Sequence, residues 1–182
     1  MNSYILIGGK SRRMGRSKTE LFFDRVSAVA QDVFEEVFAV QRYGGSPASL
    51  PTIFERPHDD QAPVFGVAAA LEHARAKCFV LAVDYPLITA EILRYLRERF
   101  ERSAAHFVAP VWSGKTQMLC AGWSPDLLPR MQERIAAKRY DLRGVAGDGD
   151  AEILAEDELR AQFADEPLMN VNTVEEWSRI RG

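Results

Sequence analysis

The fold is decided close to the start of the chain, by the stretch Tyr4-Ile5-Leu6-Ile7-Gly8-Gly9. Four apolar residues without polar alternation are typical of a strand buried on both faces, as the strands of parallel sheets are. The two glycines then end the strand in a tight turn. We therefore expect residues 4–7 to form the first strand of a sheet that helices cover on both sides.

A strongly basic loop follows this strand. Residues 8–18 hold five cations and three glycines. Glycine lets the backbone approach a phosphate closely and turn consecutive N–H groups toward one anion, and Arg and Lys can neutralise phosphate oxygens. On composition alone the loop could be a solvated basic turn, but its position after a buried strand favours phosphate binding. The GxxxxGK[ST] pattern fails, because Tyr4 and Ala109 stand where its first glycine would be, and no GxGxxG follows the strand.

Helical and extended segments alternate along the rest of the chain. The spacing of apolar residues predicts helices over 21–37, 64–76, 90–101, 125–137 and 173–181, and strands over 37–40, 52–55, 78–83, 107–111 and 118–123. This alternation is typical of an α/β protein with a mostly parallel sheet, whose ligands bind at the carboxyl ends of the strands. We predict a three-layer α/β fold and, from the length of 182 residues, one domain over residues 1–182.

A carboxylate ends one of these strands. In Phe79-Val80-Leu81-Ala82-Val83-Asp84-Tyr85-Pro86 an apolar run stops at Asp84, and Pro86 forbids further strand pairing. If this strand lies beside the first one, Asp84 faces the basic loop, and a carboxylate combined with substrate phosphates is a usual way to hold Mg²⁺. The alternative is that Asp84 is a cap or a turn residue before the helix that starts near Thr89.

Composition and charge exclude several classes of protein. The chain is 47% hydrophobic and 27% charged with a net charge of -3, as in ordinary globular proteins, and nothing in it calls for nucleic acid. No apolar run approaches the roughly 18 residues that span a membrane, so we expect a cytoplasmic protein. The two cysteines and three histidines show no metal-ligand spacing, and we expect Cys78 and Cys120 to be reduced core residues. None of the histidines is given a catalytic role.

Three groups of residues resemble those of a known family. They are Leu6-Ile7-Gly8-Gly9 with Arg13-Met14-Gly15 and Lys18, then Asp84-Tyr85-Pro86-Leu87, and near the end Asn170-Val171-Asn172-Thr173. In this order they resemble the molybdenum cofactor guanylyltransferases (MobA-type), which belong to the nucleotidyltransferases with a LAGGxSxRMGxxK-like loop. The resemblance covers nearly the whole chain, and the NVNT element narrows it toward molybdopterin.

The resemblance implies a Rossmann-like nucleotidyltransferase fold and a transfer of GMP from GTP to molybdopterin, with Mg²⁺ as cofactor and pyrophosphate as product. It also implies transient contact with molybdoenzymes or their chaperones. By this resemblance the catalytic residues are Arg13, Lys18 and Asp84, and Asp84 is also the metal ligand. The nucleotide-binding residues are Leu6, Ile7, Gly8, Gly9, Lys18, Glu55, Gly66 and Asp84, and the pterin-binding residues are Asn170 and Asn172.

The sequence departs from the family pattern in several places, and some of these departures keep alternatives open. Ile7 replaces the usual Ala, a change that backbone contacts to the phosphates survive. The departures that concern the base are a missing Gly-Lys-Pro-Leu stretch after Phe22-Phe23-Asp24, Val40 or Gln41 for an expected Asn, and Ala62-Pro63 for Gly-Pro. The alternatives are a molybdopterin cytidylyltransferase, a sugar-phosphate nucleotidyltransferase, or a protein that binds pterin or nucleotide without catalysis.

Overall fold

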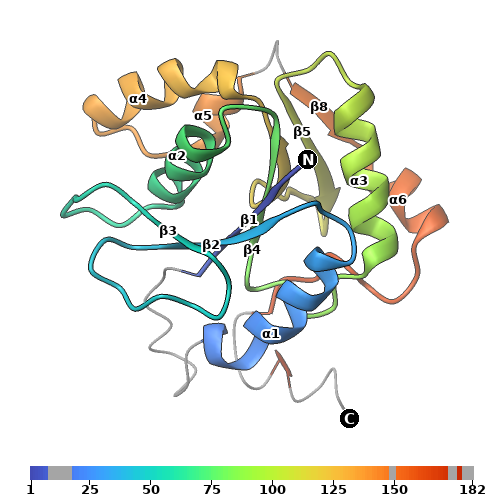
Figure 1. Cartoon of the computed structure of the whole chain (residues 1–182). Coiled ribbons are helices and arrows are strands. Elements are labelled where there is room, and N and C mark those ends of the chain that lie inside the picture. Colours follow the sequence, from blue (N-terminus) through green and yellow to red (C-terminus); the bar gives the residue numbers. More distant parts are fainter. Residues whose placement is uncertain (8–17, 148–150, 172–175, 178–182) are drawn as a thin grey trace.

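A computed structural model describes residues 1–7, 18–147, 151–171 and 176–177 of the chain. The described residues form a mixed α/β structure in which helices flank one central sheet (Figure 1). Its strands are β1 (Ser3–Leu6), β2 (Val37–Gln41), β3 (Thr52–Phe54), β4 (Cys78–Ala82), β5 (Phe107–Trp112), β6 (Lys115–Thr116), β7 (Cys120–Trp123) and β8 (Ala151–Leu154). The helices are α1 (Lys18–Gln31), α2 (Pro63–Ala74), α3 (Ala90–Arg102), the 3-10 helix η2 (Pro125–Leu127), α4 (Leu128–Ala136), α5 (Leu142–Ala146) and α6 (Glu156–Gln162).

The sheet places the two strands that carry the predicted site side by side. Its strand order is β3-β2-β1-β4-β7-β5-β6, and β8 pairs with β5. β1 is parallel to both β2 and β4, with Leu6 opposite Ala82, whereas β7 is antiparallel to β4 and β5. The predicted mostly parallel sheet is confirmed. The carboxyl ends of β1 and β4 therefore open at the same edge, where ligands of such sheets bind.

Each face of the sheet packs against its own group of helices (Figure 1). On one face, Ile5 and Leu81 lie in a core with side chains of α1, α3 and α6. On the other, Tyr4 and Val80 pack with α2, α4 and α5. Alternate residues of β1 and β4 thus enter opposite cores, which is why these strands are apolar without a polar period.

Local signals set the ends of the helices that flank the site. α2 begins with Pro63, whose missing N–H costs nothing at a first helical position, and ends at Arg75 in the left-handed conformation. α3 begins after Thr89, whose hydroxyl accepts a hydrogen bond from the backbone N–H of Ile92. Both helices therefore start at the edge of the sheet where β3 and β4 end.

Some predicted boundaries were wrong. The helix expected to reach Val37 ends at Gln31, and the chain turns through residues 32–36 into β2, although buried Val33 keeps the apolar spacing. The helix expected over 125–137 is a 3-10 turn followed by α4. Sequence reasoning missed β6, α5, β8 and α6. The helix expected at 173–181 lies largely outside the described residues, and the interpretation of the chain as one domain stays a prediction.

The two cysteines lie in the core, as expected, and two of the tryptophans are buried as well. Cys78 and Cys120 are free and buried, and burial raises the pKa of the Cys78 thiol to about 12, so it stays protonated. Trp112 and Trp123 are almost fully buried. Across the part of the chain that the structure describes, the helices are too short or too polar to cross a membrane.

Candidate active site

Asp84 lies just beyond the carboxyl end of β4, as the sequence predicts. β4 ends at Ala82, and the turn that follows is closed by a 3.1 Å hydrogen bond from the N–H of Ile88 to the carbonyl of Tyr85. The cap of α3 is Thr89. Asp84 is therefore not the cap of this helix, whereas its place in the turn after β4 agrees with the alternative of a turn residue.

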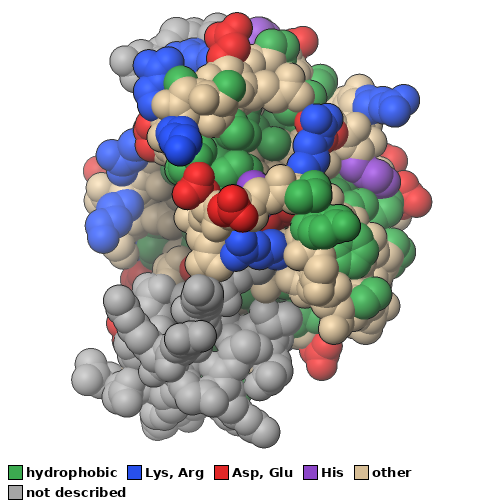
Figure 2. Space-filling model, turned by 90° about the vertical axis from the view of Figure 1, so that its left-hand side faces the viewer, with side chains coloured by type: hydrophobic (Ala, Val, Ile, Leu, Met, Phe, Trp, Pro, Cys, Tyr) green, Lys and Arg blue, Asp and Glu red, His purple; other side chains and the backbone are tan. Residues whose placement is uncertain are grey.

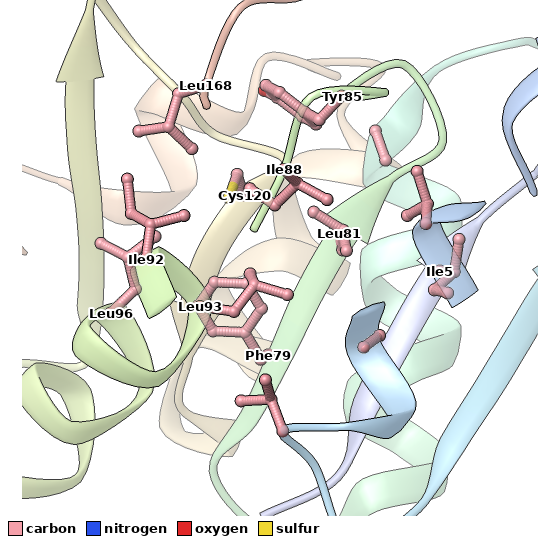
Figure 3. Packing of buried hydrophobic residues seen from close by; sticks show 14 of the residues in the cluster. Ile5, Phe79, Leu81, Tyr85, Ile88, Ile92, Leu93, Leu96, Cys120 and Leu168 are labelled. Atoms are coloured by element: carbon pink, nitrogen blue, oxygen red, sulfur yellow. The ribbon is translucent and has the colours of Figure 1, made fainter. Parts of the chain in front are cut away.

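The C-terminal segment returns to this strand end and contacts Asp84 directly. The amide Nδ2 of Asn170 donates to Oδ2 of Asp84 at 2.7 Å, and the N–H of Val171 donates to the Asp84 carbonyl at 3.0 Å. Leu168 and Val171 are buried in the same core as Ile88 and anchor the segment. Figure 3 shows Leu168 and Ile88 in this core. Two residues separated by 86 positions thus form one polar pair at the edge of the sheet.

The wall beside Asp84 is rigid and neutral. Tyr85 is 3% exposed, and its hydroxyl donates to Oε1 of Gln117 at 3.0 Å. Burial, followed by nearby negative charge that includes Asp84, raises the pKa of Tyr85 well above its ordinary value, so the phenol keeps its proton. Gln117 in turn donates to the carbonyls of Trp112 and Lys115 at 2.9 and 2.8 Å. These bonds tie the hairpin of β5 and β6 to the turn that holds Asp84.

The oxygens at this strand end fit a hard divalent cation. Among the described residues there is no group of three or more His, Cys, Asp or Glu side chains that could enclose a metal by itself. A single carboxylate is nevertheless enough when substrate phosphates supply the other ligands. The amide Oδ1 of Asn170 is buried and lacks a hydrogen-bond partner within the described part of the chain. An orphaned amide oxygen on the residue that contacts Asp84 fits a site for a cation.

The side chains of Glu55 and Leu6 both lie close to Gly66, and the nucleotide-binding role of the three residues stays a prediction. Glu55 follows β3, and its N–H donates to the carbonyl of Gln41 at 2.9 Å. A Cβ added to Gly66, in the first turn of α2, would stand 3.2 Å from Oε1 of Glu55 and 2.9 Å from Cδ2 of Leu6. The absence of a side chain at position 66 therefore lets the end of β1 and the Glu55 carboxylate approach α2.

Sequence reasoning missed a residue of this group, His58. Its Nε2 lies 2.8 Å from Oε2 of Glu55, its Nδ1 lies 2.7 Å from the carbonyl oxygen of Asp60, and its ring stacks on Phe65 with centroids 3.7 Å apart. The available signal was a histidine three residues after an acidic strand end, in a loop that also holds Pro57 and two aspartates. That spacing alone does not reveal the bend that brings the two side chains together.

Gln41 is one of the two residues that can stand where the family pattern has an asparagine, and its amide forms hydrogen bonds to the neighbouring loop. Nε2 of Gln41 donates to the carbonyl of Ser46 at 3.2 Å, and Oε1 accepts from the N–H of Arg42 at 3.3 Å. Arg42 then reaches the carbonyls of His58 and Asp59 at 3.1 and 3.3 Å. The loops that follow β2 and β3 are therefore tied to each other.

Several predicted site residues lie outside the described residues: Gly8, Gly9, Arg13 and Asn172. The loop to which the first three belong connects the end of β1 to Lys18, the first residue of α1. Ile7 keeps the end of β1 in register by donating its N–H to the carbonyl of Val40 at 3.1 Å. The roles of Lys18 and of the loop stay predictions.

A cavity of about 410 Å³ lies beside this site, between α2, α4 and the loop after β3. Its apolar lining includes Phe65, Ala69 and Ile135, and Arg56 and Glu72 form an ion pair of 2.9 Å at its polar side. Figure 2, which views the molecule from the side of α2 and α4, shows a hollow with hydrophobic side chains inside and charged ones around it. The cavity meets the residues above through His58, and its lining within the described chain does not include Asp84 or Asn170.

Comparisons with known proteins agree with this geometry. The family model described as "MobA-like NTP transferase domain" matches residues 3–150. A probable molybdenum cofactor guanylyltransferase of Aquifex aeolicus is 32% identical, over 97% of this chain and 88% of the relative. One of the same name from Mycobacterium bovis is 30% identical, over 93% and 87%. The crystal structure of molybdopterin-guanine dinucleotide biosynthesis protein A from Archaeoglobus fulgidus, 22% identical, superposes with a TM-score of 0.83 and covers 99% of this chain and 96% of that one.

Proposed function

The chain belongs to the family of MobA-like NTP transferase domains, and from this premise we propose that it transfers GMP from GTP to molybdopterin and releases pyrophosphate. The relatives that it matches over nearly their whole length carry the name molybdenum cofactor guanylyltransferase. The observation that carries the proposal is the meeting of Asp84 and Asn170 at 2.7 Å. It joins the strand-end carboxylate to the NVNT element, which the resemblance assigns to the pterin.

The reaction needs no nucleophile from the protein. A phosphate oxygen of molybdopterin is anionic at neutral pH and attacks the α-phosphorus of GTP in line with the leaving group. A bond forms between that oxygen and the α-phosphorus, and the bond from the α-phosphorus to the oxygen that bridges to the β-phosphate breaks. The electron pair leaves with pyrophosphate. The protein then contributes position and charge neutralisation.

We assign the residues to two sides of the transfer. On the nucleotide side, Leu6, Ile7, Gly8 and Gly9 present backbone groups, Arg13 and Lys18 neutralise phosphates, and Glu55 accepts a hydrogen bond from the nucleoside beside Gly66. On the acceptor side, Asn170 and Asn172 face the pterin. Asp84 lies between the two sides, at the end of the strand next to β1.

Nucleotidyltransferases of this family generally use a divalent metal ion, and we propose that it is Mg²⁺ in this protein. Asp84 and the amide oxygen of Asn170 would hold it together with phosphate oxygens, since hard oxygen ligands suit this ion. Bound there, the ion supplies positive charge that offsets the repulsion between the two phosphate groups. We also propose that the protein acts in the cytoplasm and passes its product to molybdoenzymes or their chaperones.

The experiment that tests the proposal is pyrophosphate release by the purified protein with Mg²⁺ and molybdopterin, with GTP and CTP offered in parallel. We expect release with GTP alone. Release with CTP would move the protein to the cytidylyltransferases, and release with a sugar phosphate in place of molybdopterin would change the acceptor. Binding of nucleotide without release in any of these reactions would indicate a carrier without catalysis.

A further inference from the structure

The proposed function requires the Glu55 carboxylate to face the nucleotide, and the Glu55 side chain alone does not fix that orientation. The carboxylate follows a short strand at the edge of the sheet, and a glutamate there has three side-chain torsions to fix. A hydrogen-bond acceptor that is free to turn loses conformational entropy when a ligand binds. In the structure, the contact with His58 restrains the Glu55 carboxylate.

We propose that His58 is a positioning residue that holds the Glu55 carboxylate toward the nucleotide. This inference rests on the proposed function, because it presumes that Glu55 binds the nucleoside. Both side chains are 13% exposed, so water competes little for the 2.8 Å contact between Nε2 and Oε2. With Oε2 engaged by His58, Oε1 is the oxygen beside Gly66 and Leu6, on the side where β1 ends.

The second hydrogen bond of the imidazole defines its charge. The carbonyl oxygen of Asp60 and the carboxylate of Glu55 are both acceptors, so both ring nitrogens must donate to make the two observed contacts. A ring that donates from both nitrogens is an imidazolium. The contact with Glu55 is then a charge-assisted hydrogen bond, which is stronger than a neutral one and fixes the carboxylate more firmly.

Neighbouring elements hold the imidazole itself in place. Phe65 of α2 stacks beneath the ring at an interplanar angle of 14°. Arg42 grips the backbone carbonyls of His58 and Asp59, and the hydroxyl of Tyr140 donates to the carboxylate of Asp60 at 2.5 Å. The loop after β3 is therefore hydrogen-bonded to Arg42, which follows β2, and to Tyr140, which follows α4. A ring restrained in this way can orient a carboxylate, which a mobile surface histidine could not.

Two substitutions separate the hydrogen bond from the ring stack. His58→Phe keeps an aromatic ring over Phe65 and removes both donors, whereas His58→Gln keeps an amide donor near the position of Nε2 and removes the stack. We expect His58→Phe to raise the KM and the Kd for GTP roughly fivefold with little change in kcat, because a contact made equally in the ground and transition states affects binding alone. His58→Gln should restore most of the affinity.

A double-mutant cycle with Glu55→Ala tests whether the effect passes through Glu55. GTP binding is measured by calorimetry for the wild type, both single variants and the double variant, with thermal melts to confirm folding. In the Glu55→Ala background we expect His58→Phe to cost no further affinity. His106→Gln serves as the control, since His106 is 40% exposed and directly precedes β5, which β2, β1, β4 and β7 separate from β3.

The outcomes distinguish this inference from the proposed function. Wild-type GTP affinity in a folded His58→Phe variant would overturn the inference, as would an equal loss in both backgrounds. Nitrogen-15 spectra of the imidazoles test the charge directly, because both nitrogens of His58 should carry protons while the protein is free of nucleotide. A protein that binds GTP but releases no pyrophosphate would refute the proposed function. The effect of His58 on GTP binding could still be measured by the double-mutant cycle. A protein that binds no nucleotide would overturn both.

Discussion

Two carboxylates end strands of the same sheet, and the side chains that donate hydrogen bonds to them differ in kind. Asp84 follows the central strand β4 and receives a hydrogen bond from the neutral amide of Asn170. Glu55 follows the edge strand β3 and receives one from the imidazole of His58. The amide of Asn170 adds no charge at Asp84, whereas a protonated His58 adds a positive charge beside Glu55.

This difference assigns different ligands to the two sites. The amide of Asn170 carries an oxygen that can join the Asp84 carboxylate as a ligand, so we propose the divalent cation at Asp84. At Glu55 a cation would face the imidazolium, and like charges in a shielded site repel strongly. Glu55 is suited instead to accept a hydrogen bond from a neutral N–H or O–H group. The two carboxylates should therefore respond differently to metal concentration and to nucleotide concentration.

The largest expected effect is the loss of the Asp84 carboxylate. Asp84→Ala should lower the rate of pyrophosphate release by roughly 100-fold or more, because the charge that offsets phosphate repulsion is no longer held in place. The fold should remain, since the backbone bond from Val171 to the Asp84 carbonyl does not use the side chain. Steady-state rates together with thermal melts would measure both properties.

Asp157→Ala is the matched control for this change, because Asp157 is an exposed residue in the first turn of α6. It should leave the rate unchanged. If Asp84→Ala retained near-normal activity, Asp84 would not be the metal ligand, and the contrast with Glu55 would disappear.

The next effect concerns the partner of Asp84. Asn170→Ala should raise the Mg²⁺ concentration needed for half-maximal activity about tenfold, since it removes a hydrogen bond to a charged group and one candidate oxygen ligand. The measurement is a Mg²⁺ titration at saturating GTP. An unchanged titration combined with a raised KM for molybdopterin would instead give Asn170 the pterin role alone.

The contrast between these residues also shows what the sequence can predict. The ends of β1 and β4 were predictable because both strands are buried on both faces and read as unbroken apolar runs. β8 and α6 were not, since β8 carries the charged Glu152 among its four residues and α6 is a short, mostly polar helix. Segments this short give too few periods of apolar spacing to indicate their structure.

The same limit applies to the site. Asp84 and Glu55 could be predicted individually, because each follows a recognisable strand. Their partners could not, since Asn170 reaches Asp84 across 86 positions and His58 depends on the bend of a loop. Tertiary packing, through buried Leu168 and Val171 in one case and Phe65 in the other, decides both contacts.

A smaller effect is expected at Glu55, and it should change the KM for GTP rather than the Mg²⁺ requirement. Glu55→Gln keeps the size of the side chain and removes its charge, so the hydrogen bond to the nucleotide weakens without vanishing. We expect the KM for GTP to rise roughly fivefold, while the Mg²⁺ titration stays as in the wild type. A shifted Mg²⁺ requirement in Glu55→Gln would contradict the separation of the two carboxylates.

The smallest effect tests how closely Glu55 must approach the end of β1. Gly66→Ala places a Cβ 2.9 Å from Cδ2 of Leu6 and 3.2 Å from Oε1 of Glu55. Alanine gains about 1 kcal/mol of helix propensity inside α2, but the crowding costs about 1 to 3 kcal/mol. The free energy of unfolding should therefore fall by only about 1 kcal/mol, as denaturant titration would show. The KM for GTP should still rise two- to threefold, which corresponds to roughly half a kcal/mol of binding free energy, because Oε1 is displaced. A loss of stability without any change in KM would mean that Gly66 serves packing alone and that Oε1 does not face the nucleotide.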